Sequence, residues 1–185
     1  MIQALILIDI QNDYFSGGKM ELVGMEQAAQ NARMILQKFR QHQNLVYHIQ
    51  HVSVRPGATF FRPGTNGVNI HPSVAPLDGE PVIVKHYPNS FRETGLFERL
   101  KAEGVERLTI FGAMSHMCID ATTRAAFDLG FSCTVIDDAC ATRDLQFKGE
   151  KIKAAQVHAA FMSALSAPYA AVMSATEYLA SEFNS

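Results

Sequence analysis

Short apolar runs alternate with segments of helical periodicity along most of this chain. Residues Ala4–Ile8 form an uninterrupted apolar run, too short to span a bilayer, which indicates a strand buried on both faces. In Gly24–Gln43, apolar side chains recur every three or four residues, and this spacing predicts an amphipathic helix. The first two predicted elements are therefore a buried strand and a helix that packs on it.

The elements that follow repeat this order. The further predicted strands are Leu45–Ile49, Val82–Val84, Leu108–Phe111, Thr134–Ile136 and Ala170–Met173. The further predicted helices are Thr94–Lys101, Cys118–Leu129, Gly149–Leu165 and a terminal helix that a capping-box sequence, Ser174 to Glu177, begins. Repeated strand–helix units build a parallel sheet with helices on both faces, in which ligands bind beyond the carboxyl ends of the strands. We therefore predict an α/β fold.

Length and composition are those of an ordinary globular domain. The chain has 185 residues, of which 48% are hydrophobic and 18% charged, and its net charge is -2. Because no basic stripe is present, we expect neither nucleic acid nor a membrane as a partner. The three cysteines show no disulfide framework or zinc-ligand spacing, and the N-terminus has no signal-peptide pattern. We therefore expect a cytoplasmic protein.

Cys118 is the candidate nucleophile. It follows the predicted strand Leu108–Phe111 and lies in the first turn of the next predicted helix, where unpaired N–H groups and the helix dipole favour a thiolate. Free cysteines more often serve as small buried hydrophobes, and Cys133 and Cys140 fit that interpretation. The strand–turn–helix position of Cys118 favours nucleophilic catalysis instead.

Two charged residues end other predicted strands. Asp9 follows the first strand, and Lys85 follows the third. Each alone is equally well explained as a solvated strand end. Together with Cys118 they suggest a site, because a carboxylate can accept the thiol proton and an ammonium can stabilise both charges.

Four short segments, spread over nearly the whole chain, share a recognisable pattern. They are the strand that leads into Asp9-x-Gln11-Asn12-Asp13-Tyr14, Lys85 followed by Ser90-Phe91 and Thr94-x-Leu96, Gly112-x-x-Ser115-x-x-Cys118-Ile119-x-x-Thr122, and Ala125-x-x-x-x-Gly130. In these segments the chain resembles the isochorismatase-like cysteine hydrolases, which include nicotinamidases, N-carbamoylsarcosine amidohydrolases and isochorismatases. The segments also occur in the family's order.

The resemblance implies one isochorismatase-like hydrolase domain over residues 1–185, a Rossmann-like three-layer sandwich with a six-stranded parallel sheet. It assigns Asp9 as the base, Lys85 as the charge stabiliser and Cys118 as the nucleophile. It implies that no organic cofactor is needed and that the substrate is a small molecule. Because the family often assembles as dimers or tetramers, we expect a homodimer or homotetramer.

The resemblance also implies an oxyanion hole. A cis peptide bond between Ala113 and Met114 points the backbone N–H of Met114, together with that of Cys118, at the oxygen on which negative charge develops.

One departure from the family bears on metal binding. Nicotinamidases of the family carry a metal-binding Asp-x-His after the second strand, and the matching positions here are His51 and Ser53. His48 lies three residues from His51, on the opposite face of a strand. His71 and His86 show no ligand spacing with His51. We therefore predict no metal site, and a nicotinamide substrate is disfavoured accordingly.

Substrate contacts are harder to predict. The residues named as candidates lie near strand ends, in the long loop Val52–Glu80 or beside the nucleophile: Tyr14, Phe60, Phe91 and His116. A Cys–His dyad with His116 is an alternative, but the resemblance assigns the base to Asp9. The arginines that are candidates for binding a substrate carboxylate are Arg55, Arg62 and Arg143, and the sequence does not choose among them.

The residues and the resemblance together favour a metal-independent cysteine hydrolase. It would cleave a C–N bond of a small amide, ureido or carbamoyl compound through a thioester on Cys118. One alternative is vinyl-ether hydrolysis of the isochorismatase type, which releases pyruvate and needs an acid at Asp9 more than a thiol. Another is a non-catalytic or redox-sensing thiol module on the same fold. A nucleotide-binding protein is disfavoured, because no glycine-rich phosphate loop follows the first strand.

Overall fold

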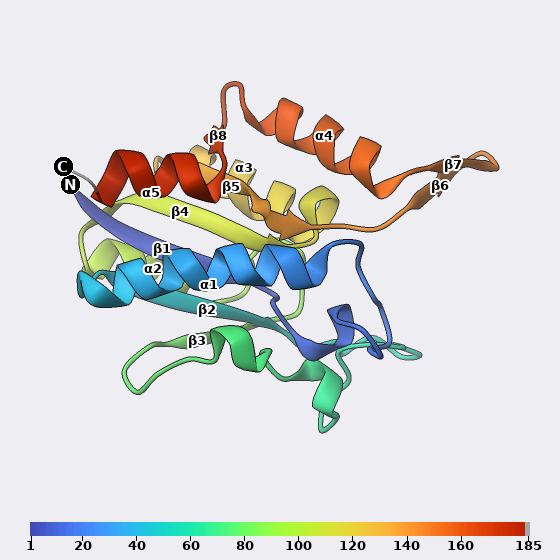
Figure 1. Cartoon of the computed structure of the whole chain (residues 1–185). Helices are drawn as coiled ribbons and strands as arrows, with labels where there is room; N and C mark the ends of the chain where they lie inside the picture. The colour runs from blue at the N-terminus through green and yellow to red at the C-terminus, as the bar shows by residue number, and fades with distance from the viewer. Residues whose placement is uncertain (184–185) are drawn as a thin grey trace.

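A parallel sheet lies at the centre of the protein, whose computed structural model describes residues 1–183 (Figure 1). Its six strands lie in the order β3-β2-β1-β4-β5-β8, and every neighbouring pair is parallel. The strands are β1 (Ile2–Ile8), β2 (Leu45–His51), β3 (Val82–Lys85), β4 (Val105–Ala113), β5 (Ser132–Ala141) and β8 (Ala171–Met173). The predicted α/β fold with a six-stranded parallel sheet is confirmed.

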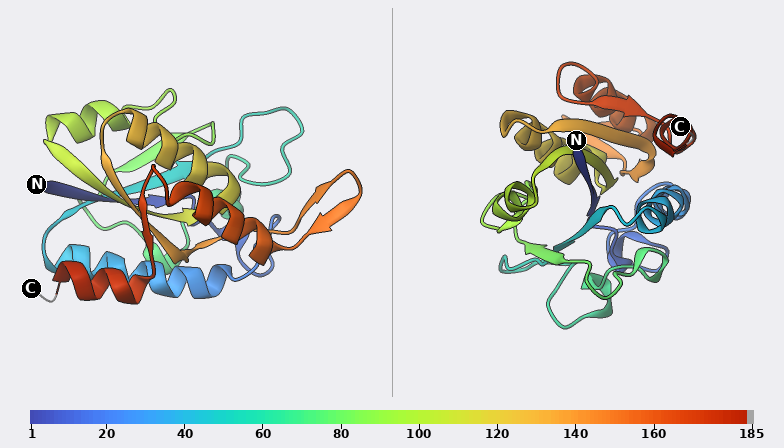
Figure 2. Two further views of the ribbon diagram at one scale, coloured as in Figure 1. Left: turned by 90° about the horizontal axis from the view of Figure 1, so that it is seen from above. Right: turned by 90° about the vertical axis from the view of Figure 1, so that its left-hand side faces the viewer.

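Helices cover both faces of this sheet (Figure 2). On one face α1 (Met25–Gln41) and α5 (Ala175–Phe183) lie side by side, and on the other lie α2 (Leu96–Ala102) and α3 (Asp120–Asp128). α4 (Ala154–Leu165) packs against α3 and the edge strand β8. None of the helices in the described part of the chain is long and apolar enough to cross a bilayer.

The core confirms the two periodicities at the start of the sequence. All residues from Ala4 to Ile8 in β1 are buried, because helices cover both faces of the sheet. The buried face of α1 contains the whole predicted apolar stripe: Ala28, Ala32, Ile35, Leu36 and Phe39. The terminal helix also begins as predicted, since Ser174 and Glu177 form the reciprocal hydrogen bonds of a capping box.

One predicted strand is too short. The apolar run ends at Ile136, but β5 continues to Ala141. Its pairing with β4 shifts register between Ile110 and Gly112, after which Cys140 pairs with Gly112. The sequence did not predict this continuation, because polar residues in the middle of β5 interrupt the apolar run from which the strand was predicted.

One predicted helix begins too early. The helix expected from Gly149 starts only at Ala154, because β6 (Leu145–Phe147) and β7 (Glu150–Ile152) form an antiparallel hairpin before it. Lys148 and Gly149, which connect the two strands, have φ values of 50° and 87°, and two positive φ values are typical of a tight hairpin turn. The hairpin projects away from the body of the protein (Figure 1).

Candidate active site

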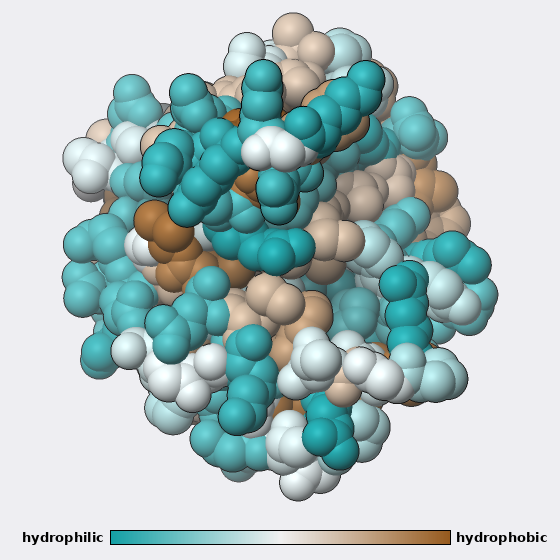
Figure 3. Space-filling model, turned by 90° about the vertical axis from the view of Figure 1, so that its right-hand side faces the viewer, coloured by the Kyte–Doolittle hydropathy of each residue, from teal (hydrophilic) through white to brown (hydrophobic). Residues whose placement is uncertain are grey.

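The candidate catalytic residues come from the carboxyl ends of three strands. Asp9 directly follows β1, Lys85 is the last residue of β3, and Cys118 lies in the turn after β4. Because the strands are parallel, these ends lie at one edge of the sheet, on the side of the molecule that Figure 3 shows. Apolar residues interrupt the largely hydrophilic surface on that side. The topology thus brings together residues that are far apart in the sequence.

Gly112 sets the distance between β1 and β4 beside the site. It has a φ of 133° and pairs with Ile8, the residue before Asp9. A Cβ atom on Gly112 would overlap with the backbone carbonyl of Ile8, so only glycine lets the two strands approach this closely. The motif glycine therefore fixes where the nucleophile's turn begins relative to Asp9.

The turn that carries Cys118 differs from the prediction. Cys118 does not open an α-helix, because Ser115–Ile119 form a π-helical turn and α3 begins only after it. The Ile119 N–H donates a hydrogen bond to the carbonyl of Met114, five residues back, at 3.3 Å. Such turns are frequent at functional sites. The peptide bond between Ala113 and Met114 is cis.

Hydrogen bonds hold this turn and its surroundings in place. Ser115 Oγ donates to the Ala141 carbonyl at 3.4 Å and lies 2.8 Å from His158 Nδ1. In the loop after β3, the Ser90 N–H donates to Thr122 Oγ1 in α3 at 3.0 Å. Several residues of the sequence motifs therefore position the loops, while others supply reactive groups.

Lys85 connects the candidate catalytic residues. Its ammonium donates to Asp9 Oδ2 at 2.8 Å and to Cys118 Sγ at 3.3 Å. It also lies 3.1 Å from His51 Nδ1 and 3.1 Å from the Tyr87 carbonyl. The ammonium has three N–H groups for these four acceptors, so at least one interaction is shared. Asp9, Lys85 and Cys118 are all buried.

The protonation of Cys118 is opposite to what its predicted helix position suggested. Burial, and then the negative charge of Asp9, raise the pKa of the Cys118 thiol, although Lys85 opposes this. Burial lowers the pKa of Lys85, but Asp9 and Cys118 outweigh burial and raise it. The resting site therefore holds a neutral thiol beside a charged ammonium.

Asp9 is placed to accept the thiol proton. Its Oδ2 is bound by Lys85, whereas its Oδ1 is buried and has no hydrogen-bond partner within the described residues. A carboxylate oxygen of Asp9 lies within 4.8 Å of Cys118 Sγ. A buried carboxylate oxygen without a partner is costly, and a transferred proton would relieve that cost.

His51 is a part of the site that the sequence did not assign. It is the last residue of β2, and its only sequence signal was its match to the metal-ligand position of nicotinamidases. Gln11 fixes its backbone on both sides: Gln11 Oε1 accepts from the His51 N–H at 2.8 Å, and Gln11 Nε2 donates to the His51 carbonyl at 2.9 Å. Burial lowers the pKa of His51 to about 4.

The donor set around His51 does not fit a metal ion. Ligand atoms of Asp9, His51 and Cys118 lie within 4.8 Å of one another, the one such group within residues 1–183. The Lys85 ammonium, however, contacts all three residues at 2.8 to 3.3 Å. A second cation would have to replace this ammonium, because the two charges repel at such a distance.

A cavity of about 310 Å³ lies next to Cys118. Its walls are mainly apolar and aromatic, and they come from the segments that follow β1, β2, β3 and β4. Besides Cys118 and His51, the lining residues include Tyr14, Phe60, Phe61, Met114 and Met117. Tyr14 and Phe60, two of the predicted substrate contacts, thus line the cavity. Burial, followed by the charges of Cys118 and Asp9, raises the pKa of Tyr14, so its phenol stays neutral.

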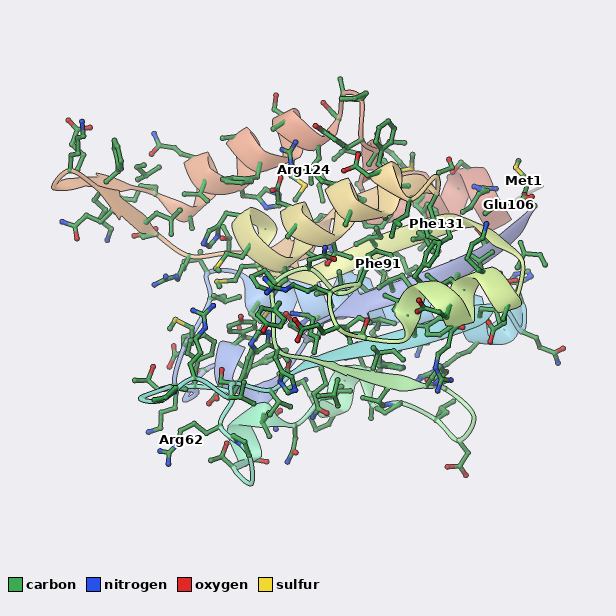
Figure 4. All side chains as sticks on the ribbon, turned by 180° about the vertical axis from the view of Figure 1, so that it is seen from behind. Met1, Arg62, Phe91, Glu106, Arg124 and Phe131 are labelled. Carbon is green, nitrogen blue, oxygen red and sulfur yellow. The ribbon has the colours of Figure 1, made fainter. Side chains whose placement is uncertain are left out.

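The two other predicted contacts lie elsewhere. Phe91 stacks against Phe131 with ring centroids 6.1 Å apart, and Figure 4 shows the two side chains between α2 and α3. His116 Nδ1 lies 2.6 Å from Thr142 Oγ1, and the ring packs edge-on against Phe161. Neither residue is among those that line the cavity. His116 is only two residues from Cys118 in the sequence, but the π-helical turn directs its side chain towards Thr142 and away from the cavity.

The structure also separates the candidate arginines. Arg55 lines the cavity beside Cys118. Arg62 is exposed and lies on the outer side of its loop, as Figure 4 shows, and Arg143 lies next to the β6–β7 hairpin. Arg55 is therefore the one of the three that lines this cavity, while Arg143 lies close enough to Tyr14 for its charge to act on that phenol.

Comparisons with known proteins agree with this fold. The isochorismatase domain family matches residues 3–177. The chain belongs to the isochorismatase family. A similar relative is the uncharacterised isochorismatase family protein YddQ of Bacillus subtilis, 51% identical over 97% of this chain and 99% of the relative.

Two further comparisons place the chain within the family. The streptothricin hydrolase of Streptomyces noursei is 35% identical over 78% of this chain, which spans only 51% of that relative. The crystal structure of an isochorismatase hydrolase from Oleispira antarctica has a TM-score of 0.92 and 54% identity, and the match covers 97% of this chain and 96% of that one. The isochorismatase family fold thus extends over nearly all of the chain.

Proposed function

We propose that this isochorismatase family member is a metal-independent cysteine amidohydrolase. It cleaves a C–N bond of a small amide, ureido or carbamoyl compound. The observation that carries the proposal is the buried contact of the Lys85 ammonium with both Asp9 and Cys118, beside a cavity that Cys118 lines. A thiol nucleophile, a carboxylate base and a fixed positive charge together can carry out acyl transfer.

The first half of the reaction forms a thioester. Asp9 accepts the Cys118 proton as the sulfur attacks the carbonyl carbon, and the backbone N–H groups of Met114 and Cys118 bind the oxyanion. The C–N bond then breaks, and Asp9 returns its proton to the leaving nitrogen. Ammonia or an amine departs, and the acyl group stays on sulfur.

The second half releases the acid. Water enters in place of the amine and attacks the thioester carbonyl, while Asp9 accepts one of its protons. The C–S bond breaks, the proton returns to Cys118, and a carboxylic or carbamic acid leaves. Lys85 keeps its positive charge throughout and stabilises whichever of the two neighbouring groups is negative.

The raised pKa of Cys118 suits this cycle. The proton stays on sulfur until a carbonyl is present, so attack and proton transfer occur together. The same property disfavours the redox-sensing alternative, because oxidation to sulfenic acid proceeds from an accessible thiolate. Cys118 is buried and none of the three cysteines is paired.

Vinyl-ether hydrolysis differs from acyl transfer in that it does not need the sulfur. That reaction protonates an enol ether and can proceed from Asp9 without a nucleophile. In acyl transfer, by contrast, Cys118 forms the covalent intermediate.

The test is ammonia release from a panel of small primary amides, ureido acids and carbamoyl compounds. We expect the wild type to release ammonia in the presence of a chelator, and Cys118→Ala to lose the activity by about 10⁴-fold or more. Cys133→Ala is the matched control, since Cys133 is also buried but lies away from the cavity. Ammonia release that survives in Cys118→Ala, or pyruvate release from isochorismate that does not need Cys118, would reject the amidohydrolase.

A further inference from the structure

His51 faces two different environments. Its Nδ1 lies 3.1 Å from the Lys85 ammonium, and its ring is part of the wall of the cavity beside Cys118. One of its ring nitrogens lies within 4.8 Å of Cys118 Sγ. The imidazole therefore lies between the catalytic lysine and the space where a substrate would bind.

The contact with Lys85 determines which ring nitrogen carries the proton. An ammonium has only donors, so His51 Nδ1 must be the acceptor of this hydrogen bond. In a neutral imidazole the proton is then on Nε2. The lysine thus selects the tautomer of His51.

The surroundings keep this imidazole neutral. Burial lowers its pKa most, the charge of Asp9 opposes this, and the charges of Lys85 and Arg55 lower the pKa further. A protonated His51 would also lose its hydrogen bond from Lys85 and place two positive charges about 3 Å apart. His51 is therefore a donor through Nε2 alone.

The Nε2–H group has no hydrogen-bond partner in the described part of the chain. Within residues 1–183 no hydrogen bond involves His51 Nε2, and this nitrogen is not among the buried polar atoms that lack a partner. Because the ring lines the cavity, Nε2 is open to it. The position thus offers a fixed, unused donor next to the nucleophile.

The rest of the cavity favours the same kind of ligand group. Its other polar lining residues, apart from Cys118, are hydroxyl-bearing or basic: Tyr14, Ser53, Arg55, Thr59 and His86. Among the described residues that line it, none is Asp or Glu. A cationic ligand group would find no acidic lining residue, whereas an acceptor or a carboxylate would find donors.

We propose that His51 orients the substrate by donating its Nε2–H to an acceptor atom close to the scissile carbonyl. The substrate class is then an amide, ureido or carbamoyl compound that carries a second acceptor, such as a carboxylate, within a few bonds of that carbonyl. This assignment of the substrate rests on the proposed hydrolysis. The tautomer and the binding preference do not.

The tautomer is tested by nitrogen-15 NMR of the histidine side chains. We expect a His51 signal from a neutral ring with the proton on Nε2, unchanged between about pH 5.5 and 8.5. His51→Gln identifies the signal by its loss. A proton on Nδ1, or a titration near pH 6 to 7, overturns the proposal.

The binding preference is tested by protection of Cys118 from iodoacetamide, which needs no turnover. The probes are isosteric pairs: malonamate with isovaleramide, oxamate with isobutyramide, and N-carbamoylglycine with isobutylurea. In at least one pair we expect the carboxylate member to protect at a concentration at least about tenfold lower. Equal protection, or none, within every pair overturns the proposal.

Variants separate His51 from the other groups of the cavity. We expect His51→Leu to abolish the preference and His51→Gln, which keeps a donor and an acceptor, to restore part of it. His48→Gln is the matched control on the same strand and should leave the preference unchanged, and thermal melting confirms that each variant folds. A preference that disappears in Arg55→Gln but survives in His51→Leu assigns recognition to Arg55 and overturns the proposal.

The two proposals fail in different ways. Ammonia release without any preference between pair members leaves the hydrolase in place and removes the role of His51. A preference and the expected tautomer without ammonia release leave His51 as a ligand contact and remove the hydrolase.

Discussion

Two histidines three residues apart on β2 each contact an ion pair, but with opposite results. His48 Nε2 lies 2.8 Å from Glu80, which Arg40 binds through two nitrogens at 2.7 Å. His51 Nδ1 lies 3.1 Å from Lys85, which binds Asp9. Successive side chains of a strand point to opposite faces of the sheet, so residues three apart, and the two clusters with them, lie on opposite faces.

The two imidazoles carry the proton on the same nitrogen. Burial lowers the pKa of both rings and so favours their neutral forms. His48 donates its Nε2–H to the Glu80 carboxylate, and its buried Nδ1 has no hydrogen-bond partner among residues 1–183. His51 uses its Nδ1 on Lys85 and leaves its Nε2–H available to the cavity.

The carboxylates of Glu80 and Asp9 also differ in how many of their oxygens have hydrogen-bond partners. Both carboxylate oxygens of Glu80 accept hydrogen bonds, and the donors are Arg40, the Leu77 N–H and His48 Nε2. Asp9 keeps one buried oxygen without a partner in the described part of the chain. A carboxylate with all its contacts made holds a structure together, whereas one with an unpartnered oxygen is ready to accept a proton.

The largest expected difference between the two clusters is in activity. Asp9→Asn should lower kcat/KM for ammonia release by about 10³-fold or more, because an amide cannot accept the thiol proton. Glu80→Gln should change it by no more than about threefold, since Glu80 lies outside the cavity. Steady-state kinetics on one amide of the panel compare them, and a fully active Asp9→Asn would contradict the assignment of the base.

The next difference is in stability. Lys85→Met leaves the buried Asp9 without its counter-charge and should lower the free energy of unfolding by about 3–5 kcal/mol. Adding Asp9→Asn should recover most of this loss, because the unpaired charge is then gone. Urea unfolding of the single and double variants measures the coupling, and strictly additive losses would show that the two residues do not act as a pair.

Acid should weaken the Glu80 cluster specifically. Burial alone would raise the pKa of Glu80, but hydrogen bonds from Arg40, Leu77 and His48 lower it to about 2 from its ordinary 4.5. A lowered pKa stabilises the fold above about pH 4.5, and this stabilisation is lost as the pH falls towards 2. Urea midpoints should fall less steeply over this range in Glu80→Gln, and identical slopes would contradict the prediction.

The smallest effect concerns the reactivity of the thiol. Asp9 raises the pKa of Cys118, so Asp9→Asn should increase the thiolate fraction and speed alkylation by iodoacetamide several-fold near pH 8. Mass spectrometry locates the label, and Cys118→Ala gives the background from the other two cysteines. Faster alkylation of Asp9→Asn together with lost turnover would show that the variant has a reactive thiol but lacks the base. Slower alkylation would show that Asp9 does not hold the proton on sulfur.

The sequence predicted the order of strands and helices and the meeting of Asp9, Lys85 and Cys118. Apolar periodicity marks where strands end, and parallel strands place all their carboxyl ends at one edge. Apolar spacing failed at two helix starts, because it does not distinguish a short hairpin or a π-helical turn from the first turn of an α-helix: a hairpin replaced the start of one predicted helix, and a π-helical turn replaced the start of another.

Only the tertiary structure decided how the site is charged and where its donors point. The raised pKa of Cys118 results from burial by several segments and from Asp9, which is 109 positions earlier in the sequence. The role of His51 depends on Lys85 reaching it from the neighbouring strand, and Phe91 and His116 found partners away from the cavity. Burial and electrostatic fields depend on all neighbours in space, and those neighbours are not encoded in the residues next to a motif.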